Sequence, residues 1–390
     1  MKKINLFIIL AFEKQTYKYN DIVNDINKNL DFNKKTMEST LSMHYSMISK
    51  YFNIYNFYEY KDKIETFDNA VIYHLPFGKD NIETGIEEKL LKFKGKVPIV
   101  FRSYDAHSPL KTSIEYMDRY HDFVITYISQ HVNSQGRVFA NLSFDNHLVK
   151  QYEKIPEKRN FACMILRKET REEYFEDTNK FKEKGLDLIK SYELRTNIVQ
   201  YEQIDIYGRN WPQSMKNYKG TLNPHINKYI TLNQYKFNFI VENVIVDNYI
   251  SEKILDSFIS LSIPVYLGSP TVEKYIPKSC FVDMRDFESN DELVKYLENM
   301  PEKEYKIYIE NIKKHREKIF DEFSTKNNFA KPVYKWYKEN YNNDLEYSDE
   351  FFENVEKDIL SKKFDDGLTM KIRLKNFIRQ SLLYFQKARA

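Results

Sequence analysis

The stretch from Asn238 to Pro270 reads NFIVENVIVDNYISEKILDSFISLSIPVYLGSP. An apolar run typical of a buried strand opens it, a polar cluster follows, and SEKILDSFISL has the spacing of an apolar helix. The run IPVYLG then returns to the pattern of a buried strand. Strand, helix and strand in this order predict two parallel strands of an α/β sheet, where ligands bind at the carboxyl ends of strands. The polar cluster stands at such an end.

Short apolar runs and amphipathic segments alternate along most of the chain. This alternation predicts an α/β protein with a parallel sheet in each half. A polar stretch with a proline, residues 152–160, separates the halves. We therefore predict an N-terminal α/β domain at 1–155, a second α/β domain at 160–335 and a helical tail at 336–390. Two Rossmann-like domains facing each other across a cleft form the GT-B architecture, which is the fold class expected here.

Three further segments are assigned from their local pattern. The N-terminal run Ile4–Phe12 resembles a signal peptide, but charged residues follow it directly, so we expect the first buried strand of a parallel sheet. LNQYKF, residues 232–237, is expected to be a short helix before the strand FNFIVE. VEKYI, residues 272–276, is expected to be a later helix.

Composition excludes several classes of protein. With 42% apolar and 16% aromatic residues, the 390-residue chain can bury the cores of two domains. A net charge of +3 gives no overall reason to expect nucleic-acid binding. The isolated Cys163 and Cys280 fit a reducing compartment better than a zinc site. No run approaches the roughly 18 apolar residues of a membrane span, so we expect a location in the cytoplasm or at the inner face of a membrane.

The end of the chain has a different character. Residues 370–390 read MKIRLKNFIRQSLLYFQKARA, with six basic residues and no acidic ones. Their apolar side chains fall on one face of a helix, which is the usual form of an interfacial membrane anchor. A helix that docks on this chain or on another subunit would show the same pattern. Both interpretations remain open.

The polar cluster of the opening stretch has the residue types of an anion site. Ser251 can cap the helix, with Glu252 and Lys253 in its first turn. A helix N-terminus directs free N–H groups and partial positive charge outward, which favours phosphate. Asn243 and Tyr249 supply neutral donors, and Glu252 can accept bonds from sugar hydroxyls. This set suits a diphosphate that carries sugars, although a surface turn with an ordinary capping pair has the same spacing.

The stretch resembles the donor-binding motif of the α-1,3/4-fucosyltransferase family. That motif runs Phe-x-x-Glu-Asn, then a Tyr six residues after the Asn, then x-Ser/Thr-Glu-Lys, and this chain repeats it from Phe239 to Lys253. Upstream, QIDIYGRNW is similar to a second segment of the family. The close similarity covers about 205–290 and a looser one about 95–335. The resemblance implies a GT-B fold and an inverting transfer of L-fucose from GDP-fucose.

The resemblance also assigns roles to individual residues. It implies donor binding by Asn243, Tyr249, Glu252 and Lys253, and Glu252 is in addition a candidate for a catalytic role. The acceptor would be a glycan hydroxyl, in an α-1,3 linkage to GlcNAc or a related sugar of a surface saccharide such as lipopolysaccharide.

Arginines are the expected partners of the donor diphosphate. The resemblance implies a phosphate-binding arginine at the start of the first helix after the strand FACMIL, where Arg171 matches best and Arg167 is the alternative. The segment YGRNWP adds Arg209 as a further candidate, next to a turn that Gly208 allows at a strand end.

An inverting transfer needs a base that takes the proton of the acceptor hydroxyl. The family places a carboxylate just after a strand of the first half, near a Ser-Pro, and VPIVFRSYDAHSPL offers Asp105 there. Bacterial relatives have Glu at this position, so the shorter Asp105 is a departure from the pattern. His107 is the alternative base. Both residues could instead only cap the turn before Pro109.

No clear metal-binding carboxylate pair follows a strand. Asp283 and Asp286 in FVDMRDF lie at the edge of the second half, where a structural role is expected. We expect no obligatory cofactor or metal, while a divalent ion is compatible with the chemistry. Two alternatives to a fucosyltransferase stay open: the same fold with another nucleotide sugar, and a non-catalytic glycan-binding protein that retains the fold. A nucleic-acid partner is not expected.

Overall fold

The computed structural model of the 390-residue chain describes a defined set of segments. They are residues 3–10, 48–75, 86–102, 119–125, 155–156, 159–168, 188–222, 227–345 and 347–361. The chain divides into one compact unit of Lys2–Leu345 and a second of Met1 and Glu346–Ala390. Of the second unit the structure describes helix α16, Asp349–Ser361. No helix in these segments is long and apolar enough to cross a membrane.

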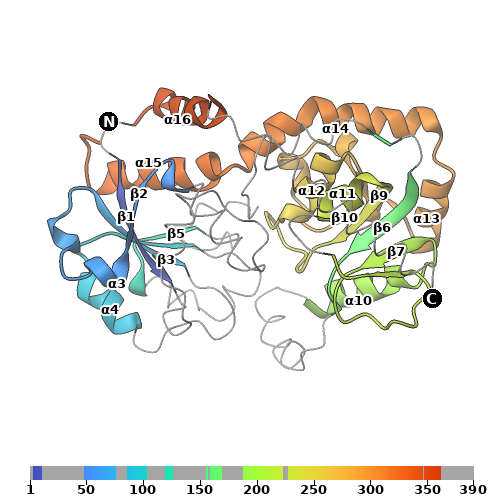
Figure 1. Ribbon diagram of the computed structural model, residues 1–390, viewed down its shortest axis with the longest axis horizontal. Helices are drawn as coiled ribbons and strands as arrows, with labels where there is room; N and C mark the ends of the chain where they lie inside the picture. The colour runs from blue at the N-terminus through green and yellow to red at the C-terminus, as the bar shows by residue number, and fades with distance from the viewer. Residues whose placement is uncertain are drawn as a thin grey trace, which may run out of the picture. The chain divides into compact units, whose positions relative to one another are not determined.

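The first sheet is parallel throughout and has the strand order β2-β1-β3-β4-β5 (Figure 1). Its strands are short runs of β-branched and aromatic residues, and β4 and β5 are buried at every position, as expected for a sheet covered on both faces. The bounds are β1 Asn5–Leu10, β2 Asn53–Asn56, β3 Ala70–Leu75, β4 Ile99–Arg102 and β5 Phe123–Ile125.

Two short helical segments and one longer helix accompany this sheet. They are α3 Phe57–Tyr60, the 3-10 turn η1 Ile64–Thr66, and α4 Ile86–Phe93. Helix α4 is amphipathic, since Ile86, Leu90 and Phe93 are buried while Glu88 and Lys92 are exposed.

The second sheet is also parallel, with the strand order β11-β10-β9-β6-β7-β8. From β6 the chain first builds outward through β7 and β8, and then returns to the other side of β6 with β9. The order therefore reverses between β6 and β9, which is the point where open α/β sheets bind ligands. The bounds are β6 Asn160–Ile165, β7 Ile204–Tyr207, β8 Tyr218–Gly220, β9 Tyr235–Val241, β10 Ile263–Leu267 and β11 Val282–Asp283.

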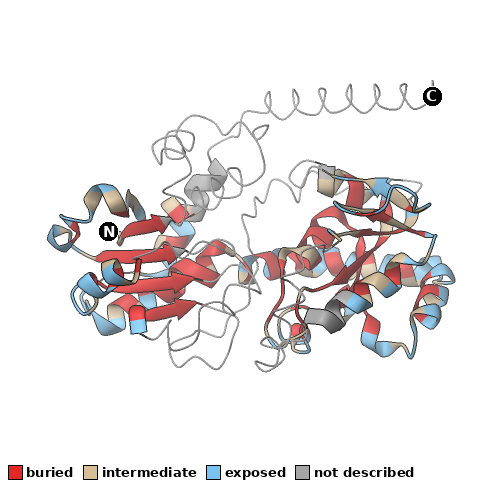
Figure 2. Ribbon diagram, turned by 90° about the horizontal axis from the view of Figure 1, so that it is seen from below, coloured by how far each residue is buried: buried red, intermediate tan, exposed pale blue. Residues whose placement is uncertain are grey.

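The helices around the second sheet complete a large apolar core. Helix α12 belongs to this core, because Ile254, Leu255, Phe258 and Ile259 are buried in the same cluster as strands β9 and β10. Figure 2 shows the strands of both sheets as mostly buried. The helices are α10 Leu188–Val199, α11 Asn227–Asn233, α12 Glu252–Ser260, α13 Asn290–Glu298 and α14 Glu302–Glu322, with 3-10 turns η2 Val272–Lys274, η3 Lys278–Cys280 and η4 Met284–Asp286.

The last part of the large unit packs against the first sheet. After α14 come a π-helical turn, η5 Lys326–Ala330, and α15 Lys331–Asn340. In α15 the Tyr334 hydroxyl accepts a hydrogen bond from the backbone N of Ile4 at 3.1 Å and donates to the backbone O of Tyr51 at 2.7 Å. Helix α15 thus runs across the boundary predicted at residue 335, and the division into domains stays a prediction.

The predicted α/β class, with a parallel sheet in each half of the chain, is confirmed. The predicted short helix LNQYKF is wrong in position, because the helix is α11 and the strand already begins at Tyr235. Tyr235 and Phe237 are buried on either side of the less buried Lys236, which is the alternation of a strand. VEKYI forms only the 3-10 turn η2.

The predicted linker ends in an anchored residue. Arg159 donates to the backbone O of Leu261 at 2.7 Å and to the Tyr305 hydroxyl at 2.6 Å, and also to the backbone O of Ser260. A guanidinium satisfies here the carbonyls that the end of α12 leaves without helical partners. Arg159 therefore fixes the far end of the helix whose N-terminus carries the candidate site.

Candidate functional site

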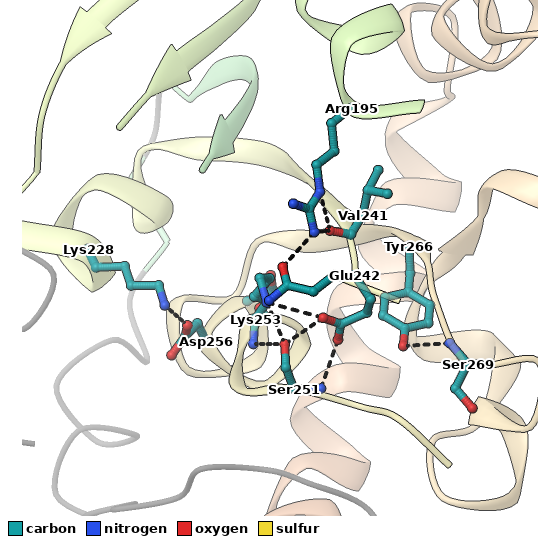
Figure 3. A network of polar contacts seen from close by, with 11 residues as sticks. Arg195, Lys228, Val241, Glu242, Ser251, Lys253, Asp256, Tyr266 and Ser269 are labelled. Carbon is teal, nitrogen blue, oxygen red and sulfur yellow. Dashed lines mark hydrogen bonds and ion pairs between the residues drawn. The ribbon is translucent and has the colours of Figure 1, made fainter. Parts of the chain in front are cut away.

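A buried carboxylate holds the turn between strand β9 and helix α12. Glu242 follows β9 directly and is 0% exposed. Its carboxylate accepts hydrogen bonds from the backbone N of Ser251 at 2.8 Å and from the Ser251 Oγ at 2.7 Å (Figure 3). Because the donors and the acceptor lie nine residues apart in sequence, the carboxylate closes the loop between them.

The first turn of α12 is capped as predicted. The Ser251 Oγ accepts a hydrogen bond from the backbone N of Lys253 at 3.4 Å. The Lys253 ammonium donates back to the Ser251 Oγ at 2.9 Å and pairs with the Glu242 carboxylate at 3.2 Å. Its side chain is 24% exposed, whereas that of Glu242 is 0% exposed. Lys253 is therefore a fixed, partly accessible cation at a helix N-terminus, as an anion site requires.

Asn243 is held by an arginine that was not among the residues predicted from the sequence. Arg195 of helix α10 donates through Nε and Nη2 to the backbone O of Val241, and through Nη2 to the Asn243 Oδ1 at 2.6 Å. Its sequence signal is a basic residue on the buried face of a helix, three positions before Ile198. Such an arginine fixes the amide of Asn243 and brings positive charge to the carboxyl end of β9.

The loop that carries Tyr249 is fixed at the preceding residue. Asn248 has a positive φ of 62°, a conformation that asparagine tolerates better than most residues. Its backbone N donates to the Thr271 Oγ1 at 2.9 Å, and its Oδ1 accepts from Thr271 and from the Tyr275 hydroxyl. Tyr249 itself is 4% exposed. The loop between β9 and α12 is thus tied to the segment after β10.

Gly268 allows the end of β10 to pack against Glu242. A Cβ atom at this position would lie 2.2 Å from the Tyr266 hydroxyl oxygen and 2.6 Å from the Cγ of Glu242. The Tyr266 hydroxyl accepts a hydrogen bond from the backbone N of Ser269 at 3.1 Å. Only glycine leaves room for this contact, so Gly268 belongs to the support of the site.

Two of the predicted arginines lie on neighbouring strand ends. Arg167 follows β6 and Arg209 follows β7, and both are exposed. The backbone N of Lys168 donates to the backbone O of Arg209 at 3.0 Å, which joins the two ends. The turn predicted at Gly208 is confirmed: its φ is 134°, and a Cβ would lie 1.7 Å from the backbone O of Leu166.

A second lysine lies beside helix α12. Lys228 of α11 forms an ion pair with the Asp256 carboxylate, with side-chain exposures of 18% and 3%. Asp256 stands one helical turn after Glu252, which is partly buried. Neither Lys228 nor Asp256 was predicted from the sequence.

The remaining predicted residues fall into two groups. Asp105, His107, Arg171 and the segment 370–390 lie outside the described residues. Asp283 has the structural environment expected of it, because its carboxylate accepts from Arg285 Nε at 2.8 Å and Nη2 at 2.6 Å. Among the segments that the structure describes, no group of three or more His, Cys, Asp or Glu side chains is arranged to hold a metal ion.

Comparison with known proteins gives a consistent result. Residues 179–342 match the model of glycosyltransferase family 10 (fucosyltransferase), C-terminal part. An alpha-(1,3)-fucosyltransferase FucT of Helicobacter pylori is 44% identical over 71 residues, covering 18% of this chain and 15% of the relative. A 4-galactosyl-N-acetylglucosaminide 3-alpha-L-fucosyltransferase 9 of Mus musculus is 40% identical over 81 residues, covering 20% and 22%. The chain thus aligns with at most about a fifth of the length of these relatives.

Solved structures with a similar backbone arrangement include two kinds of transferase. A crystal structure of an alpha1,3-fucosyltransferase has a TM-score of 0.47 at 15% identity, covering 82% of this chain and 90% of the other. An alpha-glucosyltransferase in complex with UDP has a TM-score of 0.42 at 12% identity, covering 73% and 86%.

Proposed function

We propose that this chain transfers L-fucose from GDP-fucose to a hydroxyl of a glycan, with inversion at the sugar carbon, because residues 179–342 match the model of glycosyltransferase family 10. The observation that carries the proposal is the turn from Glu242 to Lys253. It presents Asn243, Tyr249 and a fixed ammonium at the N-terminus of α12, beside the point where the strand order reverses.

The donor diphosphate would be bound by the N-terminus of α12 and by Lys253. As the bond between the sugar and the diphosphate breaks, negative charge grows on the leaving oxygens, and preorganised donors lower the barrier. Arg195 would act indirectly, since it holds the amide of Asn243. Arg167 and Arg209 are proposed as further phosphate partners because of their place at adjacent strand ends, and Arg171 is proposed from the family pattern.

The acceptor proton would pass to Asp105, with His107 as the alternative base. In the proposed single displacement, the base removes the proton of the acceptor hydroxyl, the acceptor oxygen forms the new bond to the sugar carbon, and GDP leaves from the opposite face. Strand β4 ends at Arg102, three residues before Asp105 in the sequence. This proposal assigns no step to a metal ion or another cofactor.

For the acceptor we propose a GlcNAc-containing glycan of a cell-surface saccharide. The relative from Mus musculus is named for a 4-galactosyl-N-acetylglucosaminide acceptor, which supports this proposal. Peripheral contact with a membrane through residues 370–390, and a location in the cytoplasm, belong to the same proposal.

A transfer assay tests the proposed activity. The chain is incubated with GlcNAc-containing acceptors and either GDP-fucose or UDP-GlcNAc, and the masses of the products are measured by mass spectrometry. With GDP-fucose we expect a product heavier by one fucose residue, and with UDP-GlcNAc we expect no transfer product. For Lys253→Met we expect the rate of fucose transfer to fall about 100-fold or more. Lys306→Met is the matched control, because Lys306 forms only an exposed pair with Glu302. Equal transfer from a uridine donor would contradict the proposal.

A further inference from the structure

Helix α11 places a second lysine next to the acidic face of α12. The Lys228 ammonium, on the first full turn of α11, pairs with the Asp256 carboxylate of α12. Asp256 is 2% exposed. Burying a carboxylate without a counter-charge would destabilise the fold, and Lys228 supplies that counter-charge to Asp256.

Glu252 and Asp256 are separated by one turn of α12 and therefore share a face of the helix. Two carboxylates at this spacing repel each other, and burial strengthens the repulsion. Lys228 interacts electrostatically with both of them and with Glu242. On α12 itself, Lys253 is the other cation that acts on Glu252. Lys228 thus offsets the repulsion from the side of α11.

The protonation preferences agree with this geometry. Burial raises the pKa of Glu252, but the charges of Lys253 and Lys228 outweigh it and the pKa is lowered overall. Burial raises the pKa of Asp256 to about 6, with Lys228 acting against this and Glu252 adding to it. Burial alone would lower the pKa of Lys228, yet Asp256, Glu252 and Glu242 raise it overall.

We propose that Lys228 is a positioning residue of the donor site, which keeps the Glu252 carboxylate ionised in the first turn of α12 by neutralising the acidic face that Glu252 shares with Asp256. The inference rests on the proposed function and on the role predicted for Glu252 from the sequence, in which its carboxylate accepts hydrogen bonds from the hydroxyls of the donor sugar. Lys228 therefore contributes to recognition of the sugar rather than of GDP.

Calorimetric titration with GDP-fucose and with GDP between pH 5 and pH 8 tests this role. For Lys228→Met we expect GDP-fucose binding to weaken about tenfold and GDP binding by less than about threefold. The pH below which GDP-fucose binding is lost should rise, since Glu252 then takes up a proton more easily. Lys228→Arg should restore binding of the sugar nucleotide, because it restores the charge.

Asp256→Asn keeps the test decisive if Lys228→Met fails to fold. This variant removes the carboxylate that repels Glu252 and pairs with Lys228, so the pH below which GDP-fucose binding is lost should fall. Equal weakening of GDP and GDP-fucose with an unchanged pH profile would overturn the role of Lys228. A wild-type chain that binds neither compound would instead overturn the proposed function, and the inference with it.

Discussion

The two parallel sheets differ in the buried polar side chains that lie beside their strands. In the second sheet, the end of β9 leads into a network of charges in which Glu242, Ser251 and Lys253 satisfy one another. At the first sheet, the Nδ1 of His74 in β3 lies 2.9 Å from the Nε2 of His121, which precedes β5. Both histidines are 2% exposed, and their rings stack beside Phe101. We call these the charged network and the histidine pair.

The difference concerns how far apart in sequence the partners lie. The charged network joins residues of one strand-to-helix turn, so its spacing is visible in a single stretch of sequence. The histidine pair joins residues 47 positions apart, and only the fold brings them together. The charged network carries the ammonium that a charged donor requires, whereas the histidine pair can serve packing alone.

The largest expected effect comes from breaking the charged network at its cation. Lys253→Met removes the ammonium that pairs with the fully buried Glu242 carboxylate, and we expect a loss of about 3 kcal/mol in unfolding free energy. Denaturant unfolding followed by circular dichroism measures this loss. The double variant Lys253→Met with Glu242→Gln should recover most of the stability but none of the donor binding. Recovery of both would mean that Lys253 serves the fold and not the donor.

Gly268→Ala tests how closely the strands pack behind the charged network. The added methyl group would meet the Tyr266 hydroxyl oxygen at 2.2 Å, so we expect a loss of about 2–3 kcal/mol in unfolding free energy. Gly95→Ala is the matched control for the space filled, because a Cβ there meets nothing within 4 Å, although its φ of 78° brings backbone strain of its own. An unchanged unfolding free energy for Gly268→Ala would contradict the close contact with Tyr266.

Asp256→Asn tests how the carboxylates beside the charged network change the unfolding free energy with pH. The folded chain raises the pKa of Asp256 from 3.8 to about 6, so between these values the folded state binds a proton that the unfolded state has released. This contribution makes stability fall as pH rises from about 4 to about 6, by about 2 kcal/mol. Asp256→Asn should remove that fall. Parallel stability curves for the variant and the wild type over this range would contradict the shift.

The smallest effect is expected for the histidine pair. Replacing His74 alone with Phe removes a buried hydrogen-bond partner of His121, at a cost of about 1–2 kcal/mol in unfolding free energy. Replacing both with Phe should be less costly than the sum of the two single changes, because two apolar rings leave no polar atom behind. A double-mutant cycle by thermal unfolding measures the difference. Additive losses would show that the two rings are not coupled.

Local patterns in the sequence predicted the parallel sheets and the residues of the β9–α12 turn, because strand and helix periodicity and capping act over a few residues. Arg195 and Lys228 were missed because each acts on a partner more than 20 residues away in sequence, on another element. Gly268 was missed for a related reason: the need for glycine comes from the contact with Glu242 and Tyr266. The strands β2, β8 and β11 are too short for a clear pattern.

The most direct test of the central claim, that the turn from Glu242 to Lys253 binds a guanosine diphosphate sugar, is calorimetric titration of the whole chain. The wild type, Lys253→Met and the control Lys306→Met are each titrated with GDP-fucose and UDP-GlcNAc. We expect binding of GDP-fucose by the wild type and by Lys306→Met, at least about tenfold weaker binding by Lys253→Met, and no comparable binding of UDP-GlcNAc. Equal affinity for both sugar nucleotides, or GDP-fucose binding unchanged in Lys253→Met, would contradict the claim.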